Sequence, residues 1–139
     1  TGQPPELRKA LRDYGYNIGM AFQIADDVLD YQSSTEELGK SIGDDFKEGK
    51  MTAPVIFAYQ SGSEAEKDFW HRTFEAKIIT DEDLGLAQSM IRAHGADQKT
   101  TDLALKYIDL AKSCLKNVPG SHLKEILIDL ADYTVSRKS

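Results

Sequence analysis

Apolar residues recur at three- and four-residue steps between Glu6 and Tyr31, which is the spacing of a long helix with one buried face. The positions that set this period are Leu11, Tyr14, Ile18, Phe22 and Ala25. Gly15 and Gly19 lie four residues apart in the same stretch, and each weakens a helix by roughly 1 kcal/mol relative to alanine. We therefore expect close packing against another helix or a ligand at these two glycines.

The chain after residue 51 shows the same helical period in shorter pieces. Three of the predicted starts carry cap signals, which are Thr52 before Ala53-Pro54 and the capping-box pairs Ser63–Glu66 and Thr80–Asp83. The predicted helices begin at Ala53, run from Ser63 to about Ala76, from Thr80 to about His94 and from Ala96 to Lys116, and resume at Ser121. No stretch alternates apolar and polar residues as a strand would, so the sequence predicts an all-α fold.

The segment from Gln32 to Lys50 differs, because charges and the glycines Gly39, Gly43 and Gly49 replace the helical period. A loop of almost twenty residues is longer than most connections in compact domains. Loops of this kind commonly carry function, so we expect this one to contribute to a site.

Composition narrows the class of protein. The 139 residues suit one compact domain, and a net charge of -6 argues against general nucleic-acid binding. No apolar run approaches the ~20 residues that a membrane span needs. The single Cys114 cannot form an intrachain disulfide, which favours a reducing compartment and predicts a cytoplasmic location.

An acidic cluster, Asp26, Asp27 and Asp30, closes the first long helix. Asp26 and Asp30 share one face, and two carboxylates ~6 Å apart repel by roughly 3 kcal/mol at an effective dielectric near 20. The C-terminal end of a helix also disfavours negative charge. A hard cation would compensate both costs, and Mg²⁺ prefers one or two carboxylates together with waters and phosphates. The three acids are therefore predicted to hold Mg²⁺.

A solvated acidic patch is the alternative interpretation of this cluster. The apolar flanks favour a functional site over such a patch, and they comprise Phe22, Ile24, Ala25, Val28 and Leu29. The run Asp81-Glu82-Asp83 serves as a contrast, because it falls in the first turn of a predicted helix, where the macrodipole favours acids. We interpret that second run as structural.

The long loop adds two cations, Lys40 and Lys50, after the acidic cluster. Lysines can bind the phosphate oxygens of a diphosphate whose other oxygens meet the metal. Each lysine taken alone could equally be a solvated loop residue.

The residues 22–30 (FQIADDVLD) resemble the second aspartate-rich motif of the trans-prenyl diphosphate synthases. Residues 39–45 (GKSIGDD) and 48–54 (EGKMTAP) resemble the stretch that follows this motif in the family. The pattern is similar to that of the bacterial octaprenyl and decaprenyl synthases, which make quinone side chains such as that of ubiquinone. The resemblance is close over positions 14–58, and this ordered set is far more specific than a lone DDxxD.

The resemblance implies the C-terminal part of an isoprenoid synthase helical bundle. Residues 1–31 would end in the motif, 32–51 would form a diphosphate-binding loop, and 52–139 would complete the helices. The implied activity is Mg²⁺-dependent chain elongation, in which isopentenyl diphosphate attacks the carbocation of an allylic diphosphate. The full-length enzyme would be a homodimer.

Motif position also implies roles for individual residues. Asp26 would ligate the Mg²⁺ on the allylic diphosphate, Asp27 and Asp30 would support that ligand shell, and Gln23 would orient it or polarise the developing cation. The remaining implied roles are diphosphate binding and leaving-group stabilisation by Lys40 and Lys50, and tethering of the loop or of a metal-bound water by Asp45.

The chain departs from the family at its start. Nothing in Thr1 to Tyr16 matches the family's first aspartate-rich motif or its basic residues for isopentenyl diphosphate. We therefore expect this chain alone to be inactive. Two alternatives stay open, a non-catalytic helical partner subunit of a prenyl synthase and a terpene cyclase on the same fold, although the lysine-bearing loop favours elongation.

Overall fold

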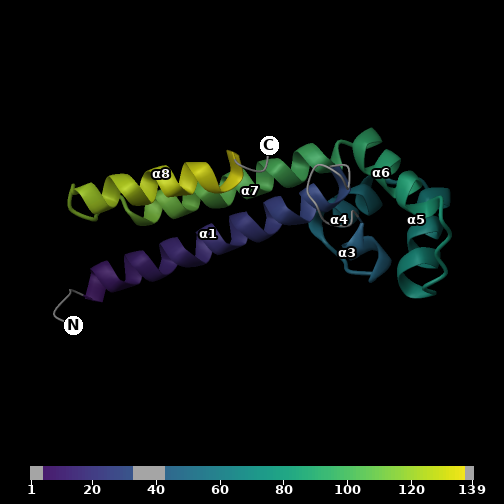
Figure 1. Ribbon diagram of the computed structural model, residues 1–139, viewed down its shortest axis with the longest axis horizontal. Helices are drawn as coiled ribbons and strands as arrows, with labels where there is room; N and C mark the ends of the chain where they lie inside the picture. Colours follow the sequence, from purple (N-terminus) through teal and green to yellow (C-terminus); the bar gives the residue numbers. More distant parts are fainter. Residues whose placement is uncertain (1–4, 33–42, 137–139) are drawn as a thin grey trace. The chain divides into compact units, whose positions relative to one another are not determined.

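The computed structural model describes residues 5–32 and 43–136, and these residues are helical with no strand among them. The predicted all-α class is confirmed. The elements are α1 (Pro5–Gln32), α3 (Asp44–Lys47), α4 (Ala53–Ser61), α5 (Glu64–Trp70), the π-helical turn η1 (His71–Glu75), α6 (Asp83–Ala93), α7 (Ala96–Cys114) and α8 (His122–Ser136) (Figure 1).

Most of the predicted helices are present with boundaries close to those expected. The capping box of Ser63 and Glu66 forms in full, since each side chain accepts the backbone N–H of the other residue. The predicted helix from Ser63 to Ala76 does not stay regular, however. Its last turn widens into η1, where the Thr73 hydroxyl donates to the Phe69 carbonyl at 3.0 Å and competes for the helical ladder.

A one-turn helix that the sequence did not predict, α3, lies within the segment expected to be a loop. Its Phe46 is fully buried and stacks on Phe69 with ring centroids 6.4 Å apart, and it meets Phe74 edge-on at 5.6 Å. This single aromatic anchor fixes a turn that is too short to show a helical period. Residues 33–42 of the expected loop, which include Lys40, lie outside the described residues.

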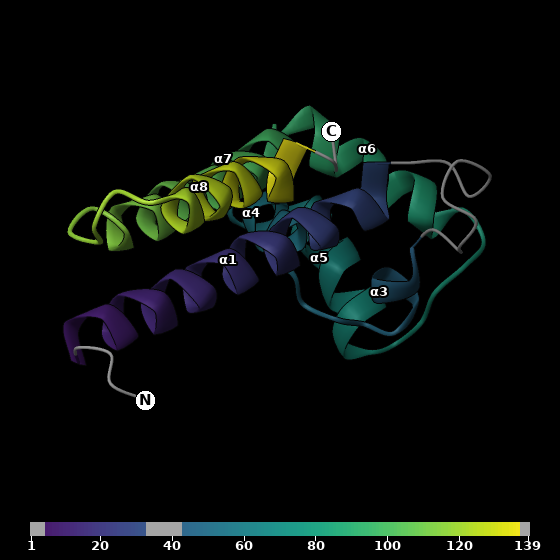
Figure 2. The ribbon, with the colours of Figure 1, turned by 60° about the vertical axis from the view of Figure 1, so that its left-hand side comes forward.

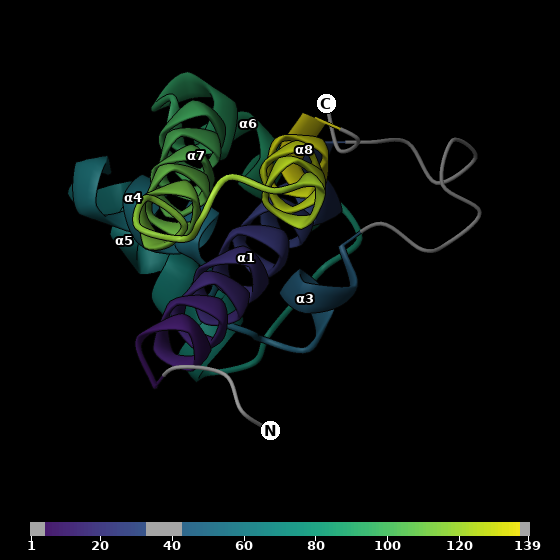
Figure 3. The same cartoon turned by 90° about the vertical axis from the view of Figure 1, so that its left-hand side faces the viewer.

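Contacts divide the chain into two compact units, of which unit 1 comprises Thr1–Ala25 and Asp102–Ser139. In unit 1, α8 and the later part of α7 run alongside the first part of α1 (Figure 2, Figure 3). Alanines such as Ala21, Ala104 and Ala111 are fully buried between these helices and allow close approach. The Tyr14 hydroxyl ties α1 to α8 by donating to the Leu127 carbonyl at 2.5 Å.

Unit 2 comprises Asp26–Thr101 and has a separate core. Its buried residues are Tyr31, Phe46, Val55, Ala58, Trp70, Phe74, Ala87, Ile91 and Ala96. The end of α1 therefore enters the core of unit 2 through Tyr31, which is 2% exposed. This unit contains the acidic cluster and the described part of the segment that follows it.

The close packing predicted at Gly15 and Gly19 is not made by any described part of the chain. Both glycines are exposed, and a Cβ added to either would meet nothing within 4 Å. The sequence-based reason for these residues therefore stays a prediction about groups outside the described residues.

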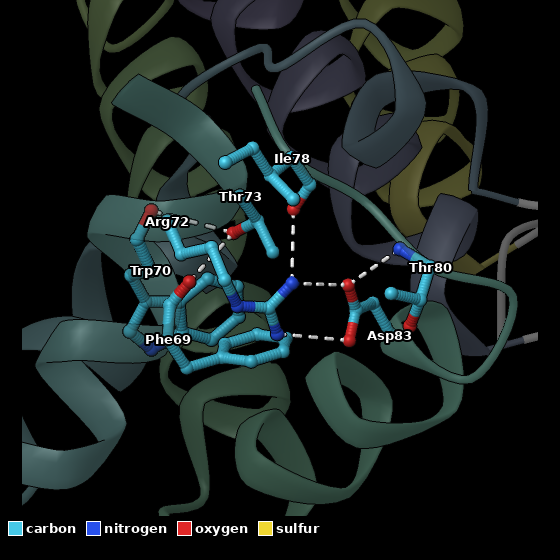
Figure 4. A network of polar contacts seen from close by, with 7 residues as sticks. All are labelled: Phe69, Trp70, Arg72, Thr73, Ile78, Thr80 and Asp83. Atoms are coloured by element: carbon cyan, nitrogen blue, oxygen red, sulfur yellow. Dashed lines mark hydrogen bonds and ion pairs between the residues drawn. The ribbon is translucent and has the colours of Figure 1, made fainter. Parts of the chain in front are cut away.

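An ion pair between the buried Asp83 and the partly exposed Arg72 closes the connection between η1 and α6 (Figure 4). The Arg72 guanidinium donates to both carboxylate oxygens of Asp83, at 2.8 and 3.0 Å, and also to the Ile78 carbonyl. The Thr80 amide adds a bond of 2.7 Å to Asp83. The hydrogen bonds from Arg72 and then from Thr80 outweigh burial and lower the pKa of Asp83 to about 2. Asp83 is thus structural, as predicted, and the bidentate ion pair accounts for that role.

We expect Asp83→Asn to lower the free energy of unfolding by about 2 kcal/mol at pH 7, because it removes a charge-assisted bond to a buried side chain. The folded-state pKa lies below the unfolded value, so this stability is present at neutral pH and is lost as pH falls from about 4 to about 2. Urea unfolding at several pH values measures the difference. Asp81→Asn, at an exposed neighbouring acid, is the control, and equal stability of Asp83→Asn and wild type at pH 7 would contradict the assignment.

We also expect the isolated chain to self-associate through α8. Leu123, Ile126, Leu130 and Tyr133 recur at three- and four-residue steps and are 48–60% exposed, which leaves an apolar stripe in water. Light scattering of Leu123→Gln/Leu130→Gln should show a shift toward monomer. Ile78→Gln, at a side chain of similar exposure outside α8, should leave association unchanged, and a wild-type chain that is monomeric at high concentration would refute the expectation.

Candidate functional site

The acids of the predicted metal site occupy the last turns of α1. The helix is continuous through Gln32, so Asp26 and Asp30 share a face as the spacing required. Asp26 and Asp27 are half-buried, whereas Asp30 is only 7% exposed. The cluster therefore combines two accessible carboxylates with one that is largely withdrawn from solvent.

The C-terminal end of α1 is held by two long-range hydrogen bonds. The Gly43 amide donates to the Asp30 carbonyl at 3.2 Å, and the Gln88 side chain donates to the Tyr31 carbonyl at 3.2 Å. Both carbonyls belong to the last turn, where no helical N–H group remains to bond them. The turn that carries the acids is thereby fixed to α3 and α6.

The structure brings Asp30 and Asp45 together, which is a contact that the sequence did not predict. The backbone amide of Asp45 donates to Asp30 Oδ2 at 3.2 Å, so the tether uses the main chain of Asp45. The carboxylate of Asp45 instead lies 3.9 Å from the Lys50 ammonium. A chain of contacts thus runs from the acidic turn to Lys50.

Lys50 is placed by its backbone and keeps most of its ammonium available. Its amide donates to the Asp45 carbonyl at 2.8 Å, which fixes the residue at the end of the α3 segment. Its side chain is 53% exposed, and the contact to Asp45 is long for an ion pair. Among the described residues this contact is the ion pair of the ammonium, which has three donors and can bind an anion.

Tyr31 belongs to the site region and was not singled out from the sequence. Its buried hydroxyl has no hydrogen-bond partner in the described part of the chain. Burial, followed by the nearby carboxylates Asp30, Asp45 and Asp27, raises the pKa of this phenol, so it stays protonated. The available signal was its place directly after the last acid of the motif.

Two further predicted residues are less well placed by the structure. Gln23 is exposed on α1, one turn before Asp26. Lys40 falls among residues that the structure does not describe. Their roles therefore stay predictions.

The donor chemistry of the cluster fits a hard divalent cation. Over residues 5–32 and 43–136, no three His, Cys, Asp or Glu side chains converge as a complete metal cage. Mg²⁺ does not require such a cage, because it uses one or two carboxylates and completes its shell with waters and substrate phosphates. Asp26 and Asp27, which are both half-buried, are the pair of carboxylates that fits this requirement.

Over the described residues, none of the helices combines the length and the apolar character needed to cross a bilayer.

Comparison with known proteins identifies the family. The polyprenyl synthetase family model matches residues 1–91. A prenyl transferase of Cyanophora paradoxa is 39% identical over 127 residues, which are 91% of this chain and 38% of that protein. The chain therefore spans well under half the length of such relatives.

Solved structures agree with this assignment. A polyprenyl synthase of Caulobacter crescentus, complexed with calcium and isoprenyl diphosphate, matches with a TM-score of 0.91 and 44% identity over 99% of this chain and 42% of that protein. A decaprenyl diphosphate synthase of Rhodobacter capsulatus gives a TM-score of 0.91 and 43% identity over the same shares. The resemblance seen in the motif is confirmed, and the chain belongs to the polyprenyl synthetase family.

Proposed function

We propose that the complete protein is a Mg²⁺-dependent prenyltransferase, which extends an allylic diphosphate with isopentenyl diphosphate to a long-chain polyprenyl diphosphate. The observation that carries this proposal is the chain of contacts that connects the acidic turn of α1 to Lys50 through Asp45. It runs through the Asp45 amide on Asp30 and the Asp45 carboxylate beside Lys50. Such a link holds metal-binding oxygens and a phosphate-binding cation in one small region.

In this proposal the acids hold the metal and the metal holds the substrate. Asp26 would ligate Mg²⁺ directly and Asp27 would support the ligand shell, directly or through water, while Asp30 would support it indirectly through its bond to the Asp45 amide. When bound, Mg²⁺ neutralises the diphosphate and helps it to leave. The Caulobacter crescentus structure with calcium and isoprenyl diphosphate supports the use of a divalent cation by this family.

The cationic residues complete the diphosphate site. We assign Lys50, and by motif position Lys40, to the phosphate oxygens that the metal does not reach. Their charge stabilises the negative charge that grows on the leaving diphosphate as the allylic carbon–oxygen bond breaks. Asp45 orients Lys50, and Gln23 orients the metal shell or polarises the developing cation.

The remaining chemistry belongs to the two substrates. The double bond of isopentenyl diphosphate forms the new carbon–carbon bond with the allylic cation, and a proton is then lost. The part of the reaction that we assign to this chain is the capture and activation of the allylic diphosphate. Because the chain corresponds to 42% of the Caulobacter crescentus enzyme, we propose that it is inactive alone.

Further features of the complete enzyme are proposals of the same kind. Likeness to a decaprenyl diphosphate synthase supports a long product that serves as a quinone side chain, such as that of ubiquinone. We propose a homodimer, and a cytoplasmic location on the grounds of the free Cys114.

Assay of the full-length protein with isopentenyl and farnesyl diphosphates tests the reaction class. We expect consumption of both substrates, a Mg²⁺ requirement and a linear product longer than farnesyl diphosphate. Release of a cyclic hydrocarbon without use of isopentenyl diphosphate would support the terpene cyclase alternative. Activity that appears only when a second polypeptide is added would support the partner-subunit alternative.

We expect Asp26→Ala in the full-length enzyme to lower kcat by about 10²-fold or more, because it removes a ligand that orders the charge-neutralising metal. The fold should remain intact, since the change also relieves repulsion at a helix end that disfavours acids. Steady-state kinetics and thermal unfolding measure the two effects. Asp81→Ala, at an exposed acid outside the acidic cluster, should leave both unchanged, and normal turnover of Asp26→Ala would refute the site assignment.

A further inference from the structure

We infer that Asp30 is a positioning residue, whose carboxylate caps α3 and thereby places Lys50, and that it is not a direct ligand of the metal. The inference rests on the proposed function for its catalytic meaning. Its structural part depends only on hydrogen bonds within unit 2.

The environment of Asp30 differs from that of the other two acids. Asp30 is 7% exposed, whereas Asp26 and Asp27 are half-buried and can reach solvent. Two atoms of Asp30 already bond the segment that follows the motif, since Oδ2 accepts from the Asp45 amide and the backbone carbonyl accepts from the Gly43 amide, each at 3.2 Å. This carboxylate therefore already accepts a hydrogen bond from the protein when no cation is bound.

The bond to Asp45 supplies a hydrogen-bond acceptor that the N-terminus of α3 otherwise lacks. The residue at the N-cap of this turn is Gly43, which has no side chain to accept a backbone N–H. A larger residue is disfavoured there, because φ is +79° and an added Cβ would lie 2.6 Å from Leu84 Cδ2, so that Leu84 would have to move. Asp30 therefore supplies from α1 the acceptor that Gly43 cannot provide.

The position of Asp45 in turn determines the position of Lys50. Phe46 locks the turn into the core between Phe69 and Phe74, and Gly49 reverses the chain with φ +72°. The Lys50 amide returns to the Asp45 carbonyl at 2.8 Å, and the Lys50 ammonium lies 3.9 Å from the Asp45 carboxylate. Asp30 thus sets the spacing between the metal-binding turn and the phosphate-binding cation.

A capping role and a ligand role predict different results for asparagine. Asparagine keeps the shape of aspartate and an oxygen that can accept the Asp45 N–H, but it lacks the negative charge. A capping residue should therefore tolerate Asp30→Asn, whereas a direct Mg²⁺ ligand should not. Asp30→Ala removes both functions.

The experiment compares Asp30→Asn, Asp30→Ala and Asp26→Asn in the full-length enzyme, with Asp44→Asn as control. Asp44 is the exposed acid next to Asp45 and has no assigned role in the site. Three quantities are measured: hydrogen exchange of the amides in residues 43–50, kcat and KM for the allylic diphosphate, and the affinity for Mg²⁺ with inorganic pyrophosphate by calorimetry.

We expect Asp30→Ala to speed exchange of the Asp45 amide and to raise KM for the allylic diphosphate, each about tenfold, since one charge-assisted hydrogen bond is lost. Asp30→Asn should stay within about threefold of wild type in exchange, KM and Mg²⁺ affinity, which corresponds to a neutral bond replacing a charge-assisted one. Asp26→Asn should lose Mg²⁺ affinity while the exchange in residues 43–50 remains slow. The Asp44→Asn control should match wild type.

Loss of Mg²⁺ affinity in Asp30→Asn as large as that in Asp26→Asn would overturn the inference, as would unchanged exchange in Asp30→Ala. If Asp30→Ala does not fold, Asp30→Asn decides by the same comparison. Wild-type enzyme that fails to bind Mg²⁺ with pyrophosphate would refute the proposed function. In that event the exchange data would still support or refute the cap.

Discussion

The hydrogen bond from the Asp45 amide to the Asp30 carboxylate organises the region on which our functional proposal depends. It joins the C-terminal turn of α1 to the first turn of α3. A carboxylate is disfavoured at the first of these places and favoured at the second, because the two helix ends carry opposite partial charges. One contact therefore offsets the cost of an acid at the end of α1 and supplies the acceptor that Gly43 lacks.

Burial separates the acids of this chain by their roles. Asp83 is 2% exposed and is fully engaged with Arg72 and Thr80, so its charge is neutralised within the protein. Asp26 and Asp27 are only half-buried, on a helix whose other face is packed. Asp30 shares features with both groups, because it is buried like Asp83 but lies next to Asp26 and Asp27 on α1. Whether an acidic residue has a structural or a chemical role therefore depends on its partners and on its exposure. Composition reports neither of these.

The errors of the sequence-based predictions have physical causes. The helix α3 was missed because four residues with one apolar anchor, Phe46, cannot show a 3.6-residue period. The widened turn η1 was missed because it depends on the choice of hydrogen-bond partner, with the Ala76 amide donating to the His71 carbonyl five residues back. The packing expected at Gly15 and Gly19 is not one of these errors: the described residues do not make it, so it stays a prediction.

Local periodicity determined the all-α class, the course of the long helices and the placing of Asp26 and Asp30 on one face, since these follow from the geometry of a single helix. The motif also identified the family. Only the tertiary structure decided that Arg72 pairs with Asp83, that Tyr31 enters the core and that Asp30 caps α3. The reason is that a hydrogen-bond partner 11 or 15 residues away along the chain is selected by the path of the backbone between the two groups. The spacing of apolar residues along the sequence does not determine that path.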